Sequence, residues 1–553
     1  ERVGRHDNFF DLGGHSLLIV SLVERLYQRG LQAEIRQVFE AQSLRELAFV
    51  LRRQVGEVWQ APPSRIPAGC TRIAPEMLPL ATLSQDEIDV IAEQVPGGAT
   101  NIQDIYPLVA LQEGILFHHR LSPESDAYIT PIILGFESRE RFDRFVDVLN
   151  KVVQRHDVLR TAVVWDGLSQ AVQVVYRQAE LLVSAFGEER AETEEDALKV
   201  LQAFVDAGRF TMDLRNPPLL KILLSESKQG TRCYAVLMSH HMITDHVSQE
   251  VLIEEVAQKL AGQGEELPEP VQYRDFVAHS LARLNEAAAE EYFRKELGDV
   301  DGPTAPFGLL DVHGDGQDIQ EAHVVVDDVL ARGVREEARS RNVSAAVLFH
   351  VAYGLVLAKC SDREDVVFGS VFSGRMGTVA GGDRMLGMFI NTLPVRMKLA
   401  GVSVEGAIRD VQATLVSLLQ YEQTPLALAQ RCSGVSGDMP LFSAVLNYRH
   451  SSSMEGELEG LFTGIEVLGG QERTNYPFSV SVDDLGDGFS LTVQTERGVD
   501  PVRIGNYLSY AIERVVKVLR SKSDEALLKQ TILPAEELEC VLRGFNDTER
   551  EYP

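Results

Sequence analysis

A proline-rich segment near the start of the chain divides it into two unequal parts. Residues 61–69 read Ala-Pro-Pro-Ser-Arg-Ile-Pro-Ala-Gly, a composition typical of a semi-rigid linker. Most of the 553 residues follow this segment, and that stretch is too long for one compact core. We therefore expect a small first domain over residues 1–54, a linker and lead-in helix over 55–100, and then a large domain with more than one lobe.

The two parts differ in their expected secondary structure. Residues 17–26 are predicted as a helix, and two short helical stretches follow at 35–39 and 43–52, which indicates a small all-α unit. The long part alternates helix-like and strand-like segments, which predicts two α/β lobes. Its expected helices are 85–94, 141–160, 247–260 and 344–360, and its expected strands are 233–239, 366–372 and 389–397.

The overall charge narrows the classes of partner. Lys and Arg number 53 against 82 Asp and Glu, which gives a net charge of −29, so we expect neither nucleic acid nor a membrane surface as a partner. The five cysteines are scattered without a CxxC pair, which favours reduced thiols in a cytoplasmic protein. The chain starts at Glu1 rather than Met, and we expect it to be a segment of a longer protein.

A first candidate site lies at Gly13-Gly-His-Ser16, where the predicted helix begins. A serine there exposes its hydroxyl beside unpaired backbone N–H groups, and the helix dipole favours an attached phosphodiester. A simple serine N-cap explains the same pattern.

The longer segment Asp7-Asn-Phe-Phe-Asp-Leu-Gly-Gly-His-Ser-Leu17 resembles the 4′-phosphopantetheine attachment motif of peptidyl carrier proteins. This resemblance implies that Ser16 carries the cofactor and that a phosphopantetheinyl transferase is a partner. Only eight residues precede Phe9, so the first helix usual in this family is missing or lies before the chain.

A second candidate site is Ser239-His-His-Met-Ile-Thr-Asp-His-Val-Ser248, between a predicted strand and a predicted helix. His240 and His241 are adjacent and should point in different directions, so they should not have the same task. Histidine exchanges protons near neutral pH. Asp245 could orient a histidine, pair with an arginine or cap the helix. Two hydrogen-bonded core histidines are the alternative, and no third ligand at metal-like spacing favours zinc.

The pattern His-His-x-x-x-Asp resembles the active-site signature of condensation domains. Other segments occur in that family's order, and the resemblance covers residues 101–520. They are Tyr106–His118, Arg155–Thr161, Tyr273–Phe276, Leu386–Thr392, Gln423–Pro425 and Pro440–Tyr448. The family implies two chloramphenicol-acetyltransferase-like lobes in a V shape with a tunnel between them. We expect the lobes over 101–270 and 271–525, and a linker toward an adenylation domain over 526–553.

The resemblance also implies roles for single residues. His241 matches the histidine that contacts the reacting amine, His240 the supporting histidine, and Asp245 the structural aspartate. Two arginines are candidates for the salt-bridge partner of this aspartate: Arg396 is preferred, and Arg375 is the alternative.

Two further residues belong to the expected tunnel. Asn447 is expected to line it. His246 stands where the family usually has glycine, so it either narrows the acceptor side or adds a titratable group.

The implied reaction joins two thioesters held on carrier domains. The acceptor amine attacks the donor aminoacyl or peptidyl thioester, so upstream and downstream carrier and adenylation domains of a non-ribosomal peptide synthetase are the expected partners. A module without catalytic activity that only docks carriers is the opposing hypothesis, and ester formation is a further one.

The segment His118-His-Arg-Leu-Ser-Pro-Glu-Ser-Asp126 resembles the additional motif of dual epimerisation/condensation domains, with Arg120 and Ser125 as departures. The resemblance implies epimerisation of the donor residue before condensation, with His118 and His119 at the donor entrance. A helix end with surface histidines, in a plain condensation domain, is the alternative.

Overall fold

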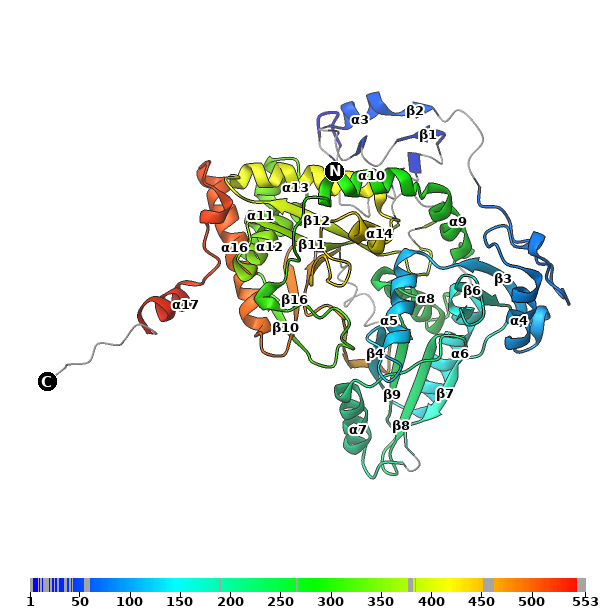
Figure 1. Cartoon of the computed structure of the whole chain (residues 1–553). Helices are drawn as coiled ribbons and strands as arrows, with labels where there is room; N and C mark the ends of the chain where they lie inside the picture. The colour runs from blue at the N-terminus through cyan, green and yellow to red at the C-terminus, as the bar shows by residue number, and fades with distance from the viewer. Residues whose placement is uncertain are drawn as a thin grey trace.

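The computed structural model describes residues 60–544 apart from 188–189, 265–266, 376–380, 383 and 451–461, together with part of the segment before residue 54. Figure 1 shows a small N-terminal region and two larger lobes. Ser16, the expected attachment residue, lies outside the described residues. About half of the positions of the helices expected at 17–26 and 35–39 also lie outside them, and the described positions of both are helical.

The described part of the N-terminal region contains a helix after Ser43, a short strand pair, and further helical positions within 19–26 and at 37–38. α3 (Leu44–Val50) begins after Ser43, whose hydroxyl accepts a hydrogen bond from the Glu46 N–H, so the helix predicted over 43–52 is confirmed in shorter form. β1 (Leu31–Gln32) pairs antiparallel with β2 (Arg52–Arg53). The unit is therefore not purely α-helical. The two segments lie outside the described helix, and the pairing satisfies backbone groups that no helix satisfies.

The proline-rich segment runs along the large domain and is attached to it. The Arg177 side chain donates to the carbonyls of Ile66 and Pro67 at 3.0 Å each, and the Arg274 side chain donates to the carbonyl of Pro62. Ile66 is buried in a cluster with α4 (Gln85–Gln94), the helix predicted at 85–94. The segment therefore acts as a fixed strap rather than a free linker.

The N-terminal lobe contains a five-stranded sheet of order β14-β4-β9-β8-β7 and a three-stranded sheet of order β3-β6-β5. Their strands are β3 (Ile102–Pro107), β4 (Ile129–Phe136), β5 (Thr161–Val164), β6 (Val172–Tyr176), β7 (Leu182–Ala185), β8 (Leu220–Glu226), β9 (Cys233–His240) and β14 (Ile465–Gly470). The helices of this lobe are α5 (Ala110–Leu121), α6 (Arg139–Arg155), α7 (Glu194–Ala207) and α8 (His246–Leu260).

The C-terminal lobe is built on a six-stranded sheet of order β10-β16-β15-β13-β11-β12 (Figure 1). Its strands are β10 (Ile319–Val325), β11 (Asp365–Phe372), β12 (Asn391–Lys398), β13 (Ala444–His450), β15 (Phe478–Asp484) and β16 (Phe489–Glu496). Its main helices are α11 (Asp328–Ser340), α12 (Ala345–Ser361), α13 (Val404–Leu418), α14 (Leu426–Arg431) and α16 (Pro501–Ser521). α9 (Tyr273–Arg283) and α10 (Glu286–Leu297) connect the lobes, and α17 (Ala535–Glu539) follows at the end.

Two segments of the C-terminal lobe cross into the N-terminal lobe. β14 pairs antiparallel with β4 and so extends the N-terminal sheet. Between β11 and β12, the chain places Met385, Leu386, Met388 and Phe389 in the core of the N-terminal lobe. The junction between the lobes is therefore built from both halves of the sequence.

Most of the strongly patterned segments fold as predicted. The buried strand at 233–239 is β9, the helix at 344–360 is α12, and the strands at 366–372 and 389–397 are β11 and β12. The helix expected over 141–160 ends at Arg155, because the Asp157 carboxylate accepts from the N–H groups of Val158 and Tyr273 and holds a separate turn. All five cysteines are free.

No single helix of the described residues is long and apolar enough to cross a membrane, although α11 and α12 pass that test as a sharply bent pair. α12 is buried along its length in the core of the C-terminal lobe.

Candidate active site

The His-His segment forms a tight turn between the end of β9 at His240 and the start of α8 at His246. Two neighbours hold the turn in place. The His241 N–H donates to the Tyr128 carbonyl at 2.8 Å, and the fully buried Gln112 side chain donates to the Met242 carbonyl at 2.8 Å. Gln112 belongs to the family-like segment at 106–118, so this segment directly supports the turn.

His240 is fully buried, and its hydrogen bonds define its tautomer. Its Nδ1 accepts from the Met242 N–H at 2.9 Å, so this nitrogen carries no proton. The proton therefore lies on Nε2, which donates to the Asp126 carboxylate at 3.0 Å. Burial lowers the pKa of His240, and the Asp126 charge only partly opposes this. His240 is thus a neutral, fixed support for the turn.

His241 is only partly buried and has the opposite tautomer. Its Nδ1 lies 3.1 Å from the Thr244 carbonyl, which can only accept, so Nδ1 carries the proton. Its Nε2 then carries no proton and accepts a hydrogen bond from the Thr130 hydroxyl at 3.3 Å. This nitrogen can accept a proton or a hydrogen bond from an amine. The two adjacent histidines therefore differ in direction, tautomer and partners, as expected from their adjacent positions.

Asp126 connects the two His-His segments of the chain. Its Oδ2 accepts from His119 Nδ1 at 2.7 Å and from His240 Nε2 at 3.0 Å, while Oδ1 accepts from the Tyr128 N–H at 2.9 Å. Burial alone would raise the pKa of Asp126, but the hydrogen bonds that it accepts from His240, His119 and Tyr128 hold the pKa far below its usual range. Asp126 is therefore a buried carboxylate with all its partners in place.

The same cluster has the residue types of a metal site. The ligand-type atoms of His119, Asp126 and His240 lie within 4.8 Å of one another. A histidine ligand must offer an unprotonated nitrogen to the ion. Both nitrogens of His240 are already committed, Nδ1 as an acceptor and Nε2 as a donor. The arrangement is that of a hydrogen-bonded triad, and it does not fit a metal centre.

Asp245 is held at the junction between the lobes by Arg375. The two side chains are each 1% exposed and are paired at 3.0 Å. Arg375 also donates to the Ser248 hydroxyl at 2.7 Å, and its guanidinium lies 3.9 Å from the centre of the Phe389 ring. Asp245 additionally caps α8 by accepting from the Ser248 N–H at 2.7 Å. The partner of Asp245 is therefore the arginine that the sequence treated as the alternative.

The backbone before Arg375 explains how this arginine reaches Asp245. Gly374 has a φ of 63°, and a Cβ at this position would lie 1.7 Å from the Phe389 carbonyl oxygen. Only glycine adopts this conformation at such a close approach. The turn at Gly374 thus directs Arg375 from the end of β11 across to the N-terminal lobe.

The preferred assignment of Arg396 was wrong. Arg396 lies on β12 and pairs with Asp365 of β11 at 2.6 Å and with Asp299, so it belongs to a cluster on the C-terminal lobe. Asp365 and Lys398 face each other in the register of β11 and β12, with Arg396 two residues away on the same face. The carboxylate partners of Arg396 lie close to it in its own lobe, whereas Asp245 lies on the other lobe.

A charged cluster next to the turn contains His246. The guanidinium of Arg449 on β13 forms ion pairs with Asp483 at 2.8 Å and with Glu472 at 2.9 Å. Burial lowers the pKa of His246, and the Arg449 charge lowers it further. Burial raises the pKa of Glu250, one turn along α8, to about 7. Asn447 is half-buried on β13, two residues before Arg449 and so on the same face of the strand.

His118 precedes His119 of the triad and has different neighbours. Its ring packs 5.9 Å from that of Tyr128 and 5.7 Å from that of His313. Burial lowers the pKa of His118 to about 4, with a smaller effect of His313 in the same direction. His118 therefore remains neutral at physiological pH, among aromatic side chains.

The sequence did not identify two residues that complete this arrangement. Asp126 is the last residue of the His118–Asp126 segment. Its bond to His240 could not be predicted, because it depends on how α5 folds back onto β4. Ser248 follows Asp245 by three residues, a spacing that brings side chain and backbone together at a helix start. That spacing was the one available signal for Ser248.

Comparison with known families gives two matches. Residues 102–520 match the family model described as the condensation domain. Residues 1–49 match the model described as the phosphopantetheine attachment site.

Two curated proteins of Mortierella alpina are similar over the whole chain. Malpibaldin synthetase is 39% identical over 554 aligned residues, and malpinin synthetase is 39% identical over 553. The chain covers 10% of the first and 7% of the second, so it spans at most a tenth of the length of these relatives.

Two solved structures have a similar fold at low sequence identity. One is a four-domain nonribosomal peptide synthetase bound to AMP and glycine, with a TM-score of 0.65 and 14% identity over 79% of this chain and 34% of that one. The other is the condensation domain of a monacolin K polyketide synthase, with a TM-score of 0.59 and 19% identity over 78% of this chain and all of that one. These matches identify the condensation-domain fold, with its two chloramphenicol-acetyltransferase-like lobes.

Proposed function

The chain belongs to the condensation-domain family, and from that premise we propose that it forms a peptide bond between two carrier-bound thioesters during nonribosomal peptide synthesis. The observation that carries this proposal is the unprotonated Nε2 of His241, which only the Thr130 hydroxyl contacts among the described residues, at a turn fixed from both lobes. A module that only docks carriers would need no such nitrogen.

The reaction needs little from the protein besides alignment and one proton acceptor. The acceptor amine attacks the donor carbonyl carbon, the new C–N bond forms, and the tetrahedral intermediate then expels the pantetheine thiolate as the C–S bond breaks. His241 Nε2 takes the amine proton and returns it to the leaving thiolate. Alignment of two tethered substrates supplies the larger part of the acceleration, and a histidine acting in this way adds about 10²–10⁴-fold.

The donor is proposed to arrive on the N-terminal carrier region. Ser16 is the proposed attachment residue of 4′-phosphopantetheine, on the basis of the motif and the family match over 1–49. Incubation with a phosphopantetheinyl transferase and coenzyme A should add one pantetheine arm, and Ser16→Ala should abolish this mass change. Ser43→Ala is the matched control, because Ser43 caps α3 and is expected to load normally. An undiminished mass change in Ser16→Ala would contradict the assignment.

The chain covers only a small share of its relatives, which suggests that its partners are other domains of a longer protein. We expect upstream and downstream carrier domains and adenylation domains on the same long synthetase, with aminoacyl or peptidyl thioesters as substrates. Incubation of the Ser16-loaded chain with an acceptor thioester on a separate carrier tests this function, with the peptide product detected by mass spectrometry. Absence of product with both substrates loaded would favour the docking module.

A second activity, epimerisation of the donor residue before condensation, is proposed on the basis of Asp126. This carboxylate bonds to His119 of the additional motif and to His240 of the main motif, so the two motifs form one hydrogen-bonded unit. A thioester acidifies the neighbouring Cα–H. A base removes this proton to give an enolate, dipoles around the site stabilise the enolate oxygen, and return of a proton to the opposite face inverts the centre. His241 is the proposed base.

The test loads Ser16 with an L-aminoacyl group that carries deuterium at Cα, in ordinary water. Loss of deuterium and appearance of the D-isomer, both dependent on His241, would support epimerisation. Full retention of deuterium with an L-configured peptide product would reduce the function to condensation alone. The two outcomes are distinct from a failure of condensation, which gives no peptide at all.

A further inference from the structure

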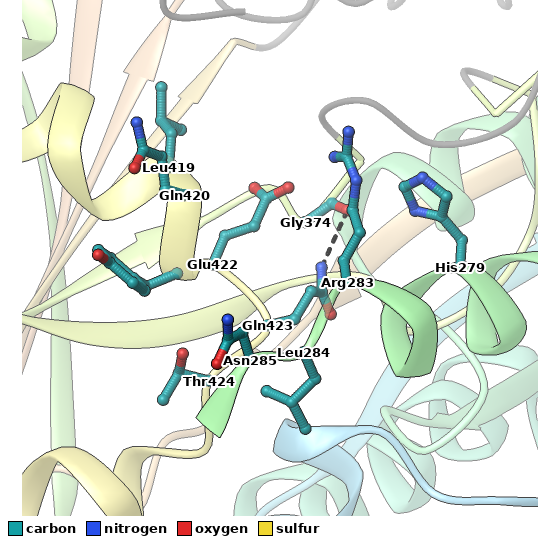
Figure 2. A pocket seen from close by; sticks show the side chains of 11 residues that line it. His279, Arg283, Leu284, Asn285, Gly374, Leu419, Gln420, Glu422, Gln423 and Thr424 are labelled. Carbon is teal, nitrogen blue, oxygen red and sulfur yellow. Dashed lines mark hydrogen bonds between the residues drawn. The ribbon is translucent and has the colours of Figure 1, made fainter. Parts of the chain in front are cut away.

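A polar pocket lies where α9 meets α10, and none of the active-site histidines lines it. Three segments line it: the end of α9 with the following turn, the backbone at Gly374, and residues 419–424 (Figure 2). The ionisable side chains that line it are Glu422, Arg283, His279 and Tyr421. Tyr421 stacks on Tyr292 at 4.5 Å, so its ring forms part of the wall.

Glu422 is the unusual group of this pocket. The residue is 6% exposed, and its Oε2 is buried without a hydrogen bond partner among the described residues. Figure 2 shows its carboxyl group pointing toward Gly374, with Arg283 beyond. The backbone on both sides is fixed, because the Asn391 side chain donates to the carbonyls of Glu422 and Thr424 at 2.8 Å each. The carboxyl group therefore cannot move away to find water at low cost.

Burial determines the charge of this carboxyl group. It raises the pKa of Glu422 to about 8, and the Arg283 charge only partly opposes the shift. At neutral pH the group is protonated, so it offers an O–H donor to the pocket. Burial lowers the pKa of His279 to about 4, with Arg283 acting in the same direction, so His279 is uncharged there.

The positive groups around the pocket are Arg283 and the start of α10. Arg283 is exposed, and it forms no ion pair with a carboxylate of the described residues. Asn285 lines the pocket and caps α10, accepting from the Ala288 N–H at 3.1 Å. The N–H groups of the first turn that precede Ala288 remain for solvent or a ligand. The opposing charge at this helix end is the exposed Glu286.

We propose that this pocket binds a small oxyanion, with the Arg283 guanidinium and the O–H of Glu422 as its donors at the start of α10. An oxyanion satisfies the buried carboxyl group and the Arg283 guanidinium together, through charge-assisted hydrogen bonds. The ligand is a phosphodiester or a carboxylate, which share this chemistry. This site is separate from the His241 site and does not depend on the proposed condensation.

The pH dependence of binding has a definite sign. An anion favours the protonated form of Glu422, and ionised Glu422 repels it. The pKa of Glu422 is about 8. The affinity for an anion should therefore fall about tenfold as the pH rises from about 7 to about 9. A cationic ligand would show the reverse change.

The experiment is calorimetric titration of the full chain with dimethyl phosphate and with acetate, since both probes keep one negative charge over this interval. Arg283→Ala should weaken binding about tenfold or more at either pH. Glu422→Gln keeps a donor but cannot ionise, so its affinity should be the same at both pH values. Arg294→Ala is the matched control: it removes an exposed arginine of α10 that pairs with Glu290, and it should bind like the wild type.

Each outcome decides the proposal. Binding of the phosphodiester alone, of acetate alone or of both supports it and identifies the chemistry of the ligand. Saturable binding of neither probe overturns it, and so does unchanged affinity in Arg283→Ala. If Glu422→Gln does not fold, Arg283→Ala still decides, because Arg283 is an exposed side chain.

Discussion

The histidine pairs at 118–119 and 240–241 lie at the ends of different elements, α5 and β9, and one member of each pair bonds to Asp126. The other members have little in common. His118 packs among the rings of Tyr128 and His313, whereas His241 is held by backbone bonds that leave its Nε2 unprotonated. The same dipeptide therefore yields an aromatic contact at one place and a candidate base at the other.

The difference arises from how firmly each pair is held. The turn with His241 is fixed at one end by Asp126 through His240 and at the other end by Asp245 through Arg375. Of these two anchoring contacts, the helix end with His118 and His119 has only the bond to Asp126. Catalytic groups need such support from their surroundings to keep a productive geometry. The pair held at both ends is thus the better place for proton transfer.

The largest effect should come from His241→Ala. The variant lacks the unprotonated Nε2, and we expect kcat/KM for peptide formation to fall by about 10²–10⁴-fold. The melting temperature should change little, because His241 is only partly buried. The measurement uses two loaded carriers and quantifies the product by mass spectrometry. Turnover equal to that of the wild type would show that the two pairs do not differ in the way described.

The next effect tests the second support of the turn. Asp245→Ala leaves the Arg375 charge buried without its carboxylate, which should lower the free energy of unfolding by about 3–5 kcal/mol. Asp365→Ala is the matched control. It makes the same change beside Arg396, but Asp365 is 39% exposed, so the cost should be about 1 kcal/mol. Equal losses in urea unfolding would contradict the distinction between the two arginines.

A smaller effect tests the bond that both pairs share. Asp126→Asn removes the charge that accepts from His119 and His240, which should cost about 1–3 kcal/mol of unfolding free energy. Asp143→Asn serves as the control, because Asp143 is an exposed partner of Arg139 on α6. If Asp126 links the pairs, its effect and that of His119→Ala should couple by about 0.5–3 kcal/mol in a double-mutant cycle. Strict additivity would separate the two motifs.

The sequence predicted the elements that have strong local patterns. The buried strand before His240, the all-round apolar helix at 344–360 and the capped helix at 85–94 depend on nearby residues, and they formed as expected. The different partners of His240 and His241 followed from the alternation of side chains along a strand.

The partners of these residues were less predictable, because they depend on the path of the chain between distant segments. The pair Asp245–Arg375 spans 130 positions and requires the turn at Gly374, whereas Arg396 has carboxylates close by in its own lobe. Glu422 is a similar case. A polar Tyr-Glu-Gln sequence reads as surface, and only the packing of α9 and the Gly374 backbone against it makes the carboxyl group buried.

The smallest effect at neutral pH should come from His118→Gln, the member with aromatic neighbours. At about pH 7.5 the histidine is neutral in both the folded and the unfolded state, so stability should change by no more than about 0.5 kcal/mol.

At lower pH the stabilities of the wild type and of His118→Gln should differ. The pKa of folded His118 is about 4, below the value of about 6.5 in an unfolded chain. The unfolded state therefore binds this proton first, and the wild type loses stability as pH falls from about 6.5 to about 4. Glutamine removes that loss, so urea unfolding of the variant should decline less over this interval. Parallel curves for the two proteins would place His118 in contact with water, and the contrast with the Asp126-bound histidines would then fail.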